Sequence, residues 1–352
     1  MKKLLCLTLT VILLMTFVGC SKDSVSMGSN DEKGENQLGD TVSEDEPNFN
    51  YKIATSATSS SIIGQTMKYA ADLISERSEG KITVESYPDG QLGSDTELIE
   101  GVQMGTIDMV IGTTAPQVSF IPDLAIFDLP NVYSDISVAQ IVLSEFTKKM
   151  EPSFENTGLR LCTMFPTVFR YMSSSKAIRS VDDFKGIKIR TMENPYHMAY
   201  WNELGATATP LAFSELYIGL QQGLVDAQEN PLDIFMSSKF YEQQNYLINT
   251  KHIAFIATIL MNQKQWDSMP IEYQDLMNDC FIEASKYGTE NAKKVEDENI
   301  KLIKEKGVEI IEPDEKTYEA IIKRVEPVYE MIRKAVGSGL VDEYLSIINK
   351  AQ

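Results

Sequence analysis

Two side chains in the middle of the sequence could together bind an anion: Arg190 and Asn230. The planar guanidinium group of arginine offers two parallel N–H donors that match the two oxygens of a carboxylate. Asparagine carries a donor and an acceptor, so it can orient a carboxylate or a hydroxyl. Arg190 ends a short β-branched run that follows the turn-like residues 182–185, which places it at the end of a predicted strand. Ligands of open α/β sheets bind at that end, and the sequence therefore predicts a cleft for an acid.

Each of these residues also has a structural alternative. Arg190 could pair with a nearby acid, either Asp182 or Glu193. Asn230 could cap the turn that follows it, since the next residue is a proline that restricts its backbone. The residue types alone leave these alternatives open.

The sequence contains little that would support catalysis. It has 2 histidines, His197 in a helix-like segment and His252 at the entry to a predicted strand, where we expect a structural role. It lacks a Gly-x-Ser-x-Gly motif, a His-Glu-x-x-His motif and a phosphate-binding loop, and no metal or cofactor site is predicted. A hydrolase with paired carboxylates remains an alternative among 51 acidic residues, but nothing in the sequence selects a pair.

The elements that would position this cleft alternate between strands and helices. Strands are predicted at 51–56, 81–87 and 107–111, with helices at 65–76 and from the N-cap signal at Ser94 to about Gly105. Such βαβαβ alternation predicts a mainly parallel sheet.

A second unit with the same alternation is predicted at residues 186–253, which gives two lobes. Beyond it, residues 270–306 have the pattern of one helix that begins after a proline and would be long enough to cross both lobes. The fold class is therefore α/β.

Residues 167–255 resemble the substrate-binding proteins of the tripartite ATP-independent periplasmic (TRAP) transporters, the DctP or SiaP family. The motifs that carry the resemblance are Arg170 with Ser173–Ile178, Asp183–Arg190, Gly205–Ala206, Pro210–Tyr217 and Val225–Pro231, and elsewhere Gly80–Ile82, Tyr87–Gly93, Gly105–Met109 and Asn249–Ile253. The resemblance implies a two-lobe fold with a ligand cleft between the lobes and a long helix that spans both. It implies that lobe I comprises 49–167 plus 256–295, and lobe II 168–255 plus 296–352.

The resemblance also implies a set of ligand-binding residues. In that family Arg190 would bind the ligand carboxylate, and Arg170 and Asn230 would converge on the same ligand. The alternative for Arg170 is an ordinary surface residue. The other positions that match the family's cleft are Phe213, where core packing is the alternative, and Ser56, Asp95, Thr113 and Glu193.

Three of these residues differ from the sialic acid members and bear on the ligand. Thr113 replaces an acid, Ser56 an amide, and Glu193 an asparagine. A carboxylate at Glu193 would accept hydrogen bonds from hydroxyls and repel a second ligand carboxylate, unless it is simply solvated or paired with an arginine. We therefore expect a sugar acid, either a hexuronate or an aldonate, with sialic acid and C4-dicarboxylates as alternatives.

The N-terminus has the pattern of an export signal. Lys2 and Lys3 precede an apolar run at residues 4–18 that is too short for an ordinary membrane-spanning helix. The run ends in Phe-Val-Gly-Cys, which resembles a lipobox with phenylalanine in place of the usual leucine, so Cys20 would be lipidated and residues 1–20 would form a lipoprotein signal. Residues 21–48 are polar and poor in large apolar side chains, which predicts a flexible tether.

Composition limits the partners further. The formal net charge of −19 at pH 7 excludes nucleic acid and anionic lipid as expected partners, because both need a basic face. Much of this acidity would simply aid solubility. Apart from Cys6 and Cys20, the cysteines are Cys162 and Cys280, for which two free thiols are expected and a single disulfide is the alternative.

We therefore expect an extracytoplasmic, lipid-anchored solute receptor rather than an enzyme. It would act as a monomer, close two lobes around a small organic acid, and deliver that acid to the membrane subunits of a TRAP transporter. A binding module for an ABC importer or a sensor is the alternative among non-enzymes, since the same fold could serve either.

Overall fold

The computed structural model describes residues 48–352. The predicted signal at 1–20, the lipidation site at Cys20 and the predicted tether, except for its last residue, lie outside the described residues. No helix in the described part of the chain is both long enough and apolar enough to cross a bilayer.

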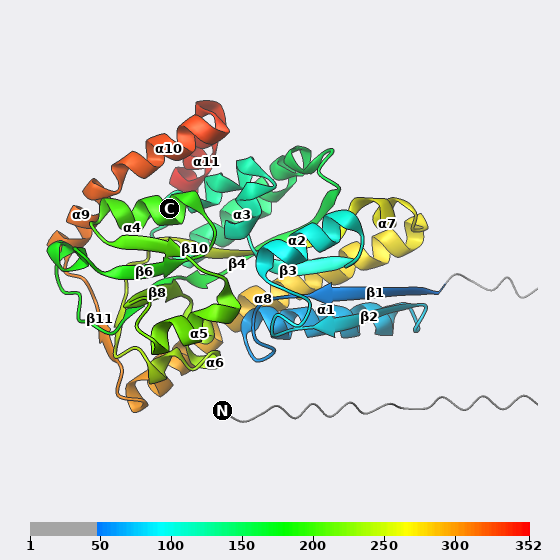
Figure 1. The fold of residues 1–352 in the computed structure, drawn as a ribbon. Coiled ribbons are helices and arrows are strands. Elements are labelled where there is room, and N and C mark those ends of the chain that lie inside the picture. Colours follow the sequence, from blue (N-terminus) through cyan, green and yellow to red (C-terminus); the bar gives the residue numbers. More distant parts are fainter. Residues whose placement is uncertain (1–47) are drawn as a thin grey trace, which may run out of the picture. The chain divides into compact units, whose positions relative to one another are not determined.

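The first of two sheets is built from the N-terminal strands. Its order is β2 (Ile82–Tyr87), β1 (Phe49–Ala54), β3 (Met109–Thr113), β10 (Ala254–Asn262) and β4 (Leu159–Phe169). Helices α1 (Ile62–Arg77), α2 (Asp95–Met104) and α3 (Ile136–Met150) pack against β2, β3 and β4, respectively (Figure 1).

The predicted start of α2 is confirmed in atomic detail. The Ser94 side chain accepts from the backbone N–H of Glu97, and the Glu97 carboxylate accepts from the backbone N–H of Ser94 at 2.8 Å. This capping box satisfies two donors that the first helical turn leaves open. The helix ends at Gly105, whose φ of 76° is the left-handed conformation that glycine adopts without strain.

The second sheet contains Arg190 and Asn230. Its order is β11 (Glu309–Ile311), β9 (Tyr246–Ile248), β5 (Tyr171–Ser174), β8 (Ala227–Asn230), β6 (Lys188–Thr191) and β7 (Thr207–Pro210). Helices α4 (Pro195–Glu203), α5 (Phe213–Gln221) and α6 (Leu232–Ser237) follow β6, β7 and β8 along the chain.

The predicted parallel pairing of the first three strands is confirmed, but neither sheet is parallel throughout. β2, β1 and β3 are parallel, but β10 runs antiparallel to both of its neighbours, and β5 does the same in the second sheet. The reason lies in the two places where the chain passes directly between sheets. β4 continues through Arg170 into β5, and β9 continues through residues 249–253 into β10. Because no helix reverses the chain at these two connections, one of the two connected strands runs antiparallel to its neighbours. This strand is β5 in the first connection and β10 in the second.

The predicted long helix is confirmed as α8 (Ile271–Glu305), which has 35 residues and follows the short α7 (Gln263–Asp267). At about 1.5 Å per residue it spans roughly 52 Å. It packs on α1 and β4 of the first sheet and on α6 and β11 of the second, as its course in yellow and orange shows (Figure 1).

Two regions were left unassigned from the sequence. Residues 115–154 contain the short 3-10 helices η1 (Ala115–Ser119), η2 (Pro122–Asp128) and η3 (Glu151–Phe154). Outside this region, the short 3-10 helices η4 (Val181–Phe184) and η5 (Phe240–Glu242) lie in the second half of the chain. The C-terminus forms α9 (Glu315–Arg324), α10 (Glu326–Val336) and α11 (Ser338–Ala351). Helix α10 packs on η2 and α4, and α11 packs on α3. The C-terminal helices therefore contact elements that come before and after the connection between β4 and β5.

Candidate functional site

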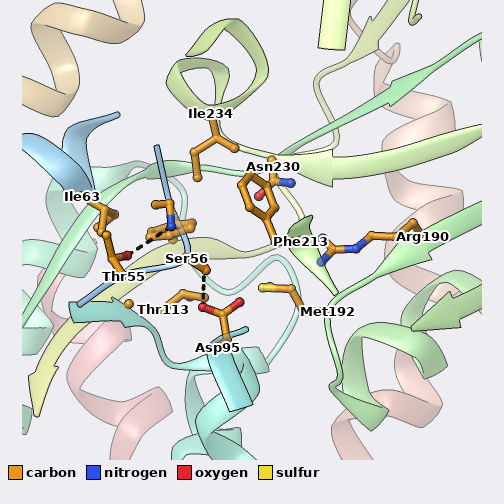
Figure 2. Close-up of a pocket in the computed structure, with 13 residues that line it drawn as sticks. Thr55, Ser56, Ile63, Asp95, Thr113, Arg190, Met192, Phe213, Asn230 and Ile234 are labelled. Carbon is orange, nitrogen blue, oxygen red and sulfur yellow. Dashed lines mark hydrogen bonds between the residues drawn. The ribbon is translucent and has the colours of Figure 1, made fainter. Parts of the chain in front are cut away.

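A pocket of about 380 Å³, part of it open to solvent, lies between the two sheets. The carboxyl ends of β1, β3, β6 and β8, or the turns after them, all contribute to it, as expected for open α/β sheets. Its lining residues are Thr55, Ser56, Ala57, Ile63, Asp95, Gly112, Thr113, Arg190, Met192, Phe213, Asn230, Ile234 and Phe255 (Figure 2).

Arg190 is the buried cation of this pocket. Only 1% of its surface is exposed, and its Nε donates to the backbone carbonyl of Leu211 at 2.8 Å. Its Nη1 has no hydrogen-bond partner, and no carboxylate among residues 48–352 lies within ion-pair distance of the guanidinium. Burial lowers the pKa of Arg190 to about 10, although the charge of Glu229 opposes the shift, so the side chain is still protonated at neutral pH.

The structural alternatives for Arg190 are not realised in the structure. Asp182 pairs with Arg324 at 2.6 Å. Glu193 is exposed and accepts a hydrogen bond from the Thr96 hydroxyl at 2.5 Å. A buried guanidinium without a counterion is costly, and a ligand carboxylate would supply the missing charge.

Glu193 lies beside the main pocket rather than in its lining. It lines a smaller pocket of about 260 Å³ that shares Arg190, Asp95 and Phe213 with the main one. Its bond to Thr96 connects the loop after β6 to the first turn of α2. Glu193 therefore links the two halves of the site at its rim.

Asn230 and Arg170 are held together. The Nη2 of Arg170 donates to Asn230 Oδ1 at 3.0 Å, and Asn230 Nδ2 donates to Gln228 Oε1 at 2.6 Å. Asn230 lines the pocket, and its side chain caps no turn, because α6 begins without a side-chain cap. Arg170 is buried behind Asn230, pairs with Glu229 and does not line the pocket, although its Nη1 has no partner.

Three residues predicted on the first lobe form the polar part of the lining. Ser56 follows β1, Thr113 ends β3, and Asp95 opens α2. The Ser56 hydroxyl donates to Asp95 Oδ1 at 2.6 Å. Burial raises the pKa of Asp95, and the nearby charge of Arg190 partly offsets the shift. These groups can accept hydrogen bonds from ligand hydroxyls.

Phe213 begins α5 and is half-buried in the pocket wall. Its ring centroid lies 6.0 Å from the Arg190 guanidinium carbon and 6.1 Å from the Phe240 ring centroid. The ring therefore packs on the protein core and also faces the pocket, so the two roles considered for it coexist.

The sequence did not indicate a buried ionic network centred on Glu229. This carboxylate pairs with Arg170 and contacts His197 Nδ1 at 3.3 Å and His252 Nε2 at 3.1 Å. The other ring nitrogen of His197 lies 3.0 Å from Asp128 Oδ1. Burial disfavours the charged carboxylate, but Arg170 and the two histidines outweigh it and hold the pKa of Glu229 well below its usual range.

The two histidines in this network have opposite protonation states. Burial opposes a charge on His197, but Asp128 and Glu229 outweigh it and raise the pKa of His197 to about 9. Burial lowers the pKa of His252, whose Nδ1 is 2.7 Å from the Thr250 hydroxyl. The structural role expected for His252 fits this packing. No signal in the sequence links these residues, because the contacts join positions up to 69 residues apart.

A pH dependence of stability follows from His197. We expect the free energy of unfolding to fall between pH 6.5 and about 9, by roughly 2 to 4 kcal/mol. The folded-state pKa lies above the unfolded value, so the stabilisation is complete below pH 6.5 and is lost as the pH rises through 9. Urea unfolding across this range would measure it.

Two histidine variants separate this effect from other titrations. His197→Gln should flatten the slope above pH 6.5. His252→Gln should keep it, because the pKa of His252 is lowered and the ring is neutral throughout that range. An unchanged slope in His197→Gln would assign the effect to other groups.

Comparison with known proteins identifies the family. The profile of the bacterial extracellular solute-binding protein family 7, DctP, matches residues 53–335. The chain belongs to the DctP family. The resemblance inferred from its motifs, to the solute-binding proteins of TRAP transporters, is thereby confirmed.

Similar DctP-family proteins extend over most of the chain. A solute-binding protein of Verminephrobacter eiseniae is 32% identical over 84% of this chain and 88% of its own length. The 2,3-diketo-L-gulonate-binding periplasmic protein YiaO of Escherichia coli is 31% identical over 68% of this chain and 74% of its own. The crystal structure of the sugar acid binding protein DctPAm of Advenella mimigardefordensis with galactonate has a TM-score of 0.85 and 29% identity, covering 88% of this chain and 100% of that one. This structural similarity confirms the predicted two-lobe α/β fold.

Membership of the DctP family makes this chain an extracytoplasmic solute-binding protein of a transport system, which is not a class of enzyme.

Cys162 on β4 and Cys280 on α8 are free thiols. Burial raises their pKa values to about 12 and about 11. No group of three or more His, Cys, Asp or Glu within residues 48–352 is arranged to hold a metal ion.

Proposed function

We propose that this protein is the receptor of a TRAP transporter and captures a small organic acid through a contact between the ligand carboxylate and Arg190. The observation that carries the proposal is the Arg190 guanidinium, which is buried in the pocket with an unpartnered Nη1 and no protein counterion. A ligand carboxylate would bind it through charge-assisted hydrogen bonds. Arg170 would act by orienting Asn230 toward the same ligand.

Lobe closure would couple binding to transport. Hydrogen bonds already join the lobes near the pocket; for example, Thr96 donates to Glu193, and the backbone N–H of Ile62 donates to Asp233 Oδ2 at 2.9 Å. A ligand that contacts both lobes binds the closed form better and shifts the population toward it. The closed form would then be the one that the membrane subunits recognise. One chain supplies both halves of the pocket, which is consistent with a monomer.

The ligand class that we favour is a sugar acid, an aldonate or a hexuronate. DctPAm was crystallised with galactonate, and YiaO binds 2,3-diketo-L-gulonate. In this chain Ser56, Asp95 and Thr113 offer acceptors for hydroxyls. The carboxylates of Asp95 and Glu193 would repel the second charge of a C4-dicarboxylate. We therefore rank C4-dicarboxylates, together with sialic acid, behind sugar acids as ligands.

Thermal shift with a ligand panel tests the proposal. The panel would contain hexuronates, aldonates, sialic acid and C4-dicarboxylates, because a ligand that binds only the native state must raise the unfolding midpoint. A shift with monoacid sugars supports the proposed class. A shift confined to dicarboxylates keeps the receptor but overturns the roles of Asp95 and Glu193. No shift with any acid would contradict acid binding.

We also propose that Cys20 carries a lipid that anchors the receptor to the membrane, with residues 21–48 as the tether. The support is the lipobox-like sequence at the end of the apolar run. We expect the protein, expressed in a bacterium, to partition into detergent, and Cys20→Ser to move it into the aqueous phase. Cys162→Ser is the matched control and should stay in the detergent phase. Aqueous partitioning of the unmodified protein would refute the anchor.

A further inference from the structure

The pocket has walls of two different kinds. Figure 2 shows Arg190 and Met192 on one side of the pocket and Ile63 on the opposite side, with Ile234 above and Asp95 below. The oxygens of Ser56, Asp95 and Thr113, which could accept from ligand hydroxyls, belong to the lower wall. The side chains of Ile63, Ile234 and Phe255, which form the other wall, have no polar atom. The polar neighbours of this wall already have protein partners: the Thr55 hydroxyl accepts from the backbone N–H of Ala57, and the Asn230 amide is bonded to Arg170 and Gln228.

This apolar wall is almost completely buried. Ile63, Ile234 and Phe255 are 2%, 4% and 5% exposed, and all three belong to one buried cluster. They come from α1, α6 and β10, so the wall is built from three separate elements. A ligand hydroxyl facing it would lose its water without gaining a hydrogen-bond partner, which is unfavourable. A methyl or methylene group there would instead bury apolar surface.

The polar wall lies near the carboxylate end of the pocket. The charge of Arg190 acts on the titration of Asp95, and both residues also line the smaller neighbouring pocket. A ligand with its carboxylate on Arg190 would therefore present its nearest hydroxyls to Asp95 and Ser56. The carbons farthest from the carboxylate would face Ile63 and Ile234.

We infer that the ligand is an acid with hydroxyls near its carboxylate and an unoxygenated carbon segment at its far end. Among sugar acids, this describes deoxy acids such as 6-deoxyhexonates. The inference rests on the proposed function, because it assumes that Arg190 binds the carboxylate. It adds a requirement that a fully hydroxylated aldonate does not meet.

Matched pairs of ligands test this inference by calorimetry. L-Fuconate and L-galactonate differ only in the hydroxyl on carbon 6, as do L-rhamnonate and L-mannonate. We expect the deoxy acid to bind roughly ten- to a hundredfold more tightly in any pair that binds. Equal or tighter binding of the hydroxylated acid would overturn the inference. Binding of other acids in the panel would also overturn the inference if neither pair binds. If no acid binds at all, the proposed function itself is refuted.

Variants of the apolar wall provide a second test. Ile234→Val and Ile234→Thr have side chains of nearly the same shape, but threonine adds a hydroxyl to the wall. We expect Ile234→Val to keep the preference for the deoxy acid and Ile234→Thr to reduce it by about fivefold or more. If both variants show the same preference, the wall does not set the specificity. Thermal unfolding of both variants checks that they fold.

Discussion

We expect Arg190→Ala to weaken acid binding by roughly a hundredfold or more, because the ligand carboxylate would then be desolvated without a partner. Arg190 is the one pocket-lining residue among those described that carries a positive charge, and it lies almost fully buried. Arg190→Lys should recover only part of the affinity, since an ammonium group cannot form the paired hydrogen bonds of a guanidinium. Calorimetric titration of each variant with the acid that gives the largest thermal shift would measure both effects.

A surface arginine provides the control for this experiment. Arg179 is exposed, pairs with Glu309 at 2.7 Å and does not line the pocket. Arg179→Ala removes the same side chain and should leave the affinity unchanged. A loss under threefold in Arg190→Ala would show that the carboxylate binds elsewhere.

The second large effect concerns stability. We expect Glu229→Gln to lower the free energy of unfolding by about 3 to 5 kcal/mol, the usual cost of breaking a buried ion pair by removing one partner. The glutamine keeps the shape of the side chain but leaves Arg170 and protonated His197 without the carboxylate that they share. Denaturant unfolding at pH 7 would measure the loss.

Glu309→Gln is the matched substitution at the surface. Glu309 pairs with the exposed Arg179, and exposed pairs contribute about 0 to 1 kcal/mol. Equal losses in the two glutamine variants would contradict a central role for Glu229. The folded fraction of Glu229→Gln should also bind acid less well, because Arg170 would no longer hold Asn230 in place.

Local features of the fold were accessible from the sequence. The capping box of Ser94 and Glu97, the strand that ends near Arg190 and the long helix from Ile271 to Glu305 each depend on residues close together along the chain. Such elements are specified by backbone propensity and by the period of apolar residues, which a sequence displays directly. The direction of β10 was not accessible in this way, because it depends on how the chain passes between sheets.

In the candidate site, too, some features follow from residues close together in the sequence and others from contacts between distant residues. The sequence by itself determined that an arginine would lie at the carboxyl end of a strand in an α/β fold, and the motifs around it determined the family. Only the tertiary structure decided that Asp182 pairs with Arg324, so that Arg190 has no counterion among the described residues. It also placed Glu229 between Arg170 and two histidines, and Ile63 opposite Arg190. These contacts join residues far apart in the chain, and their energies depend on burial, which arises only when the elements pack.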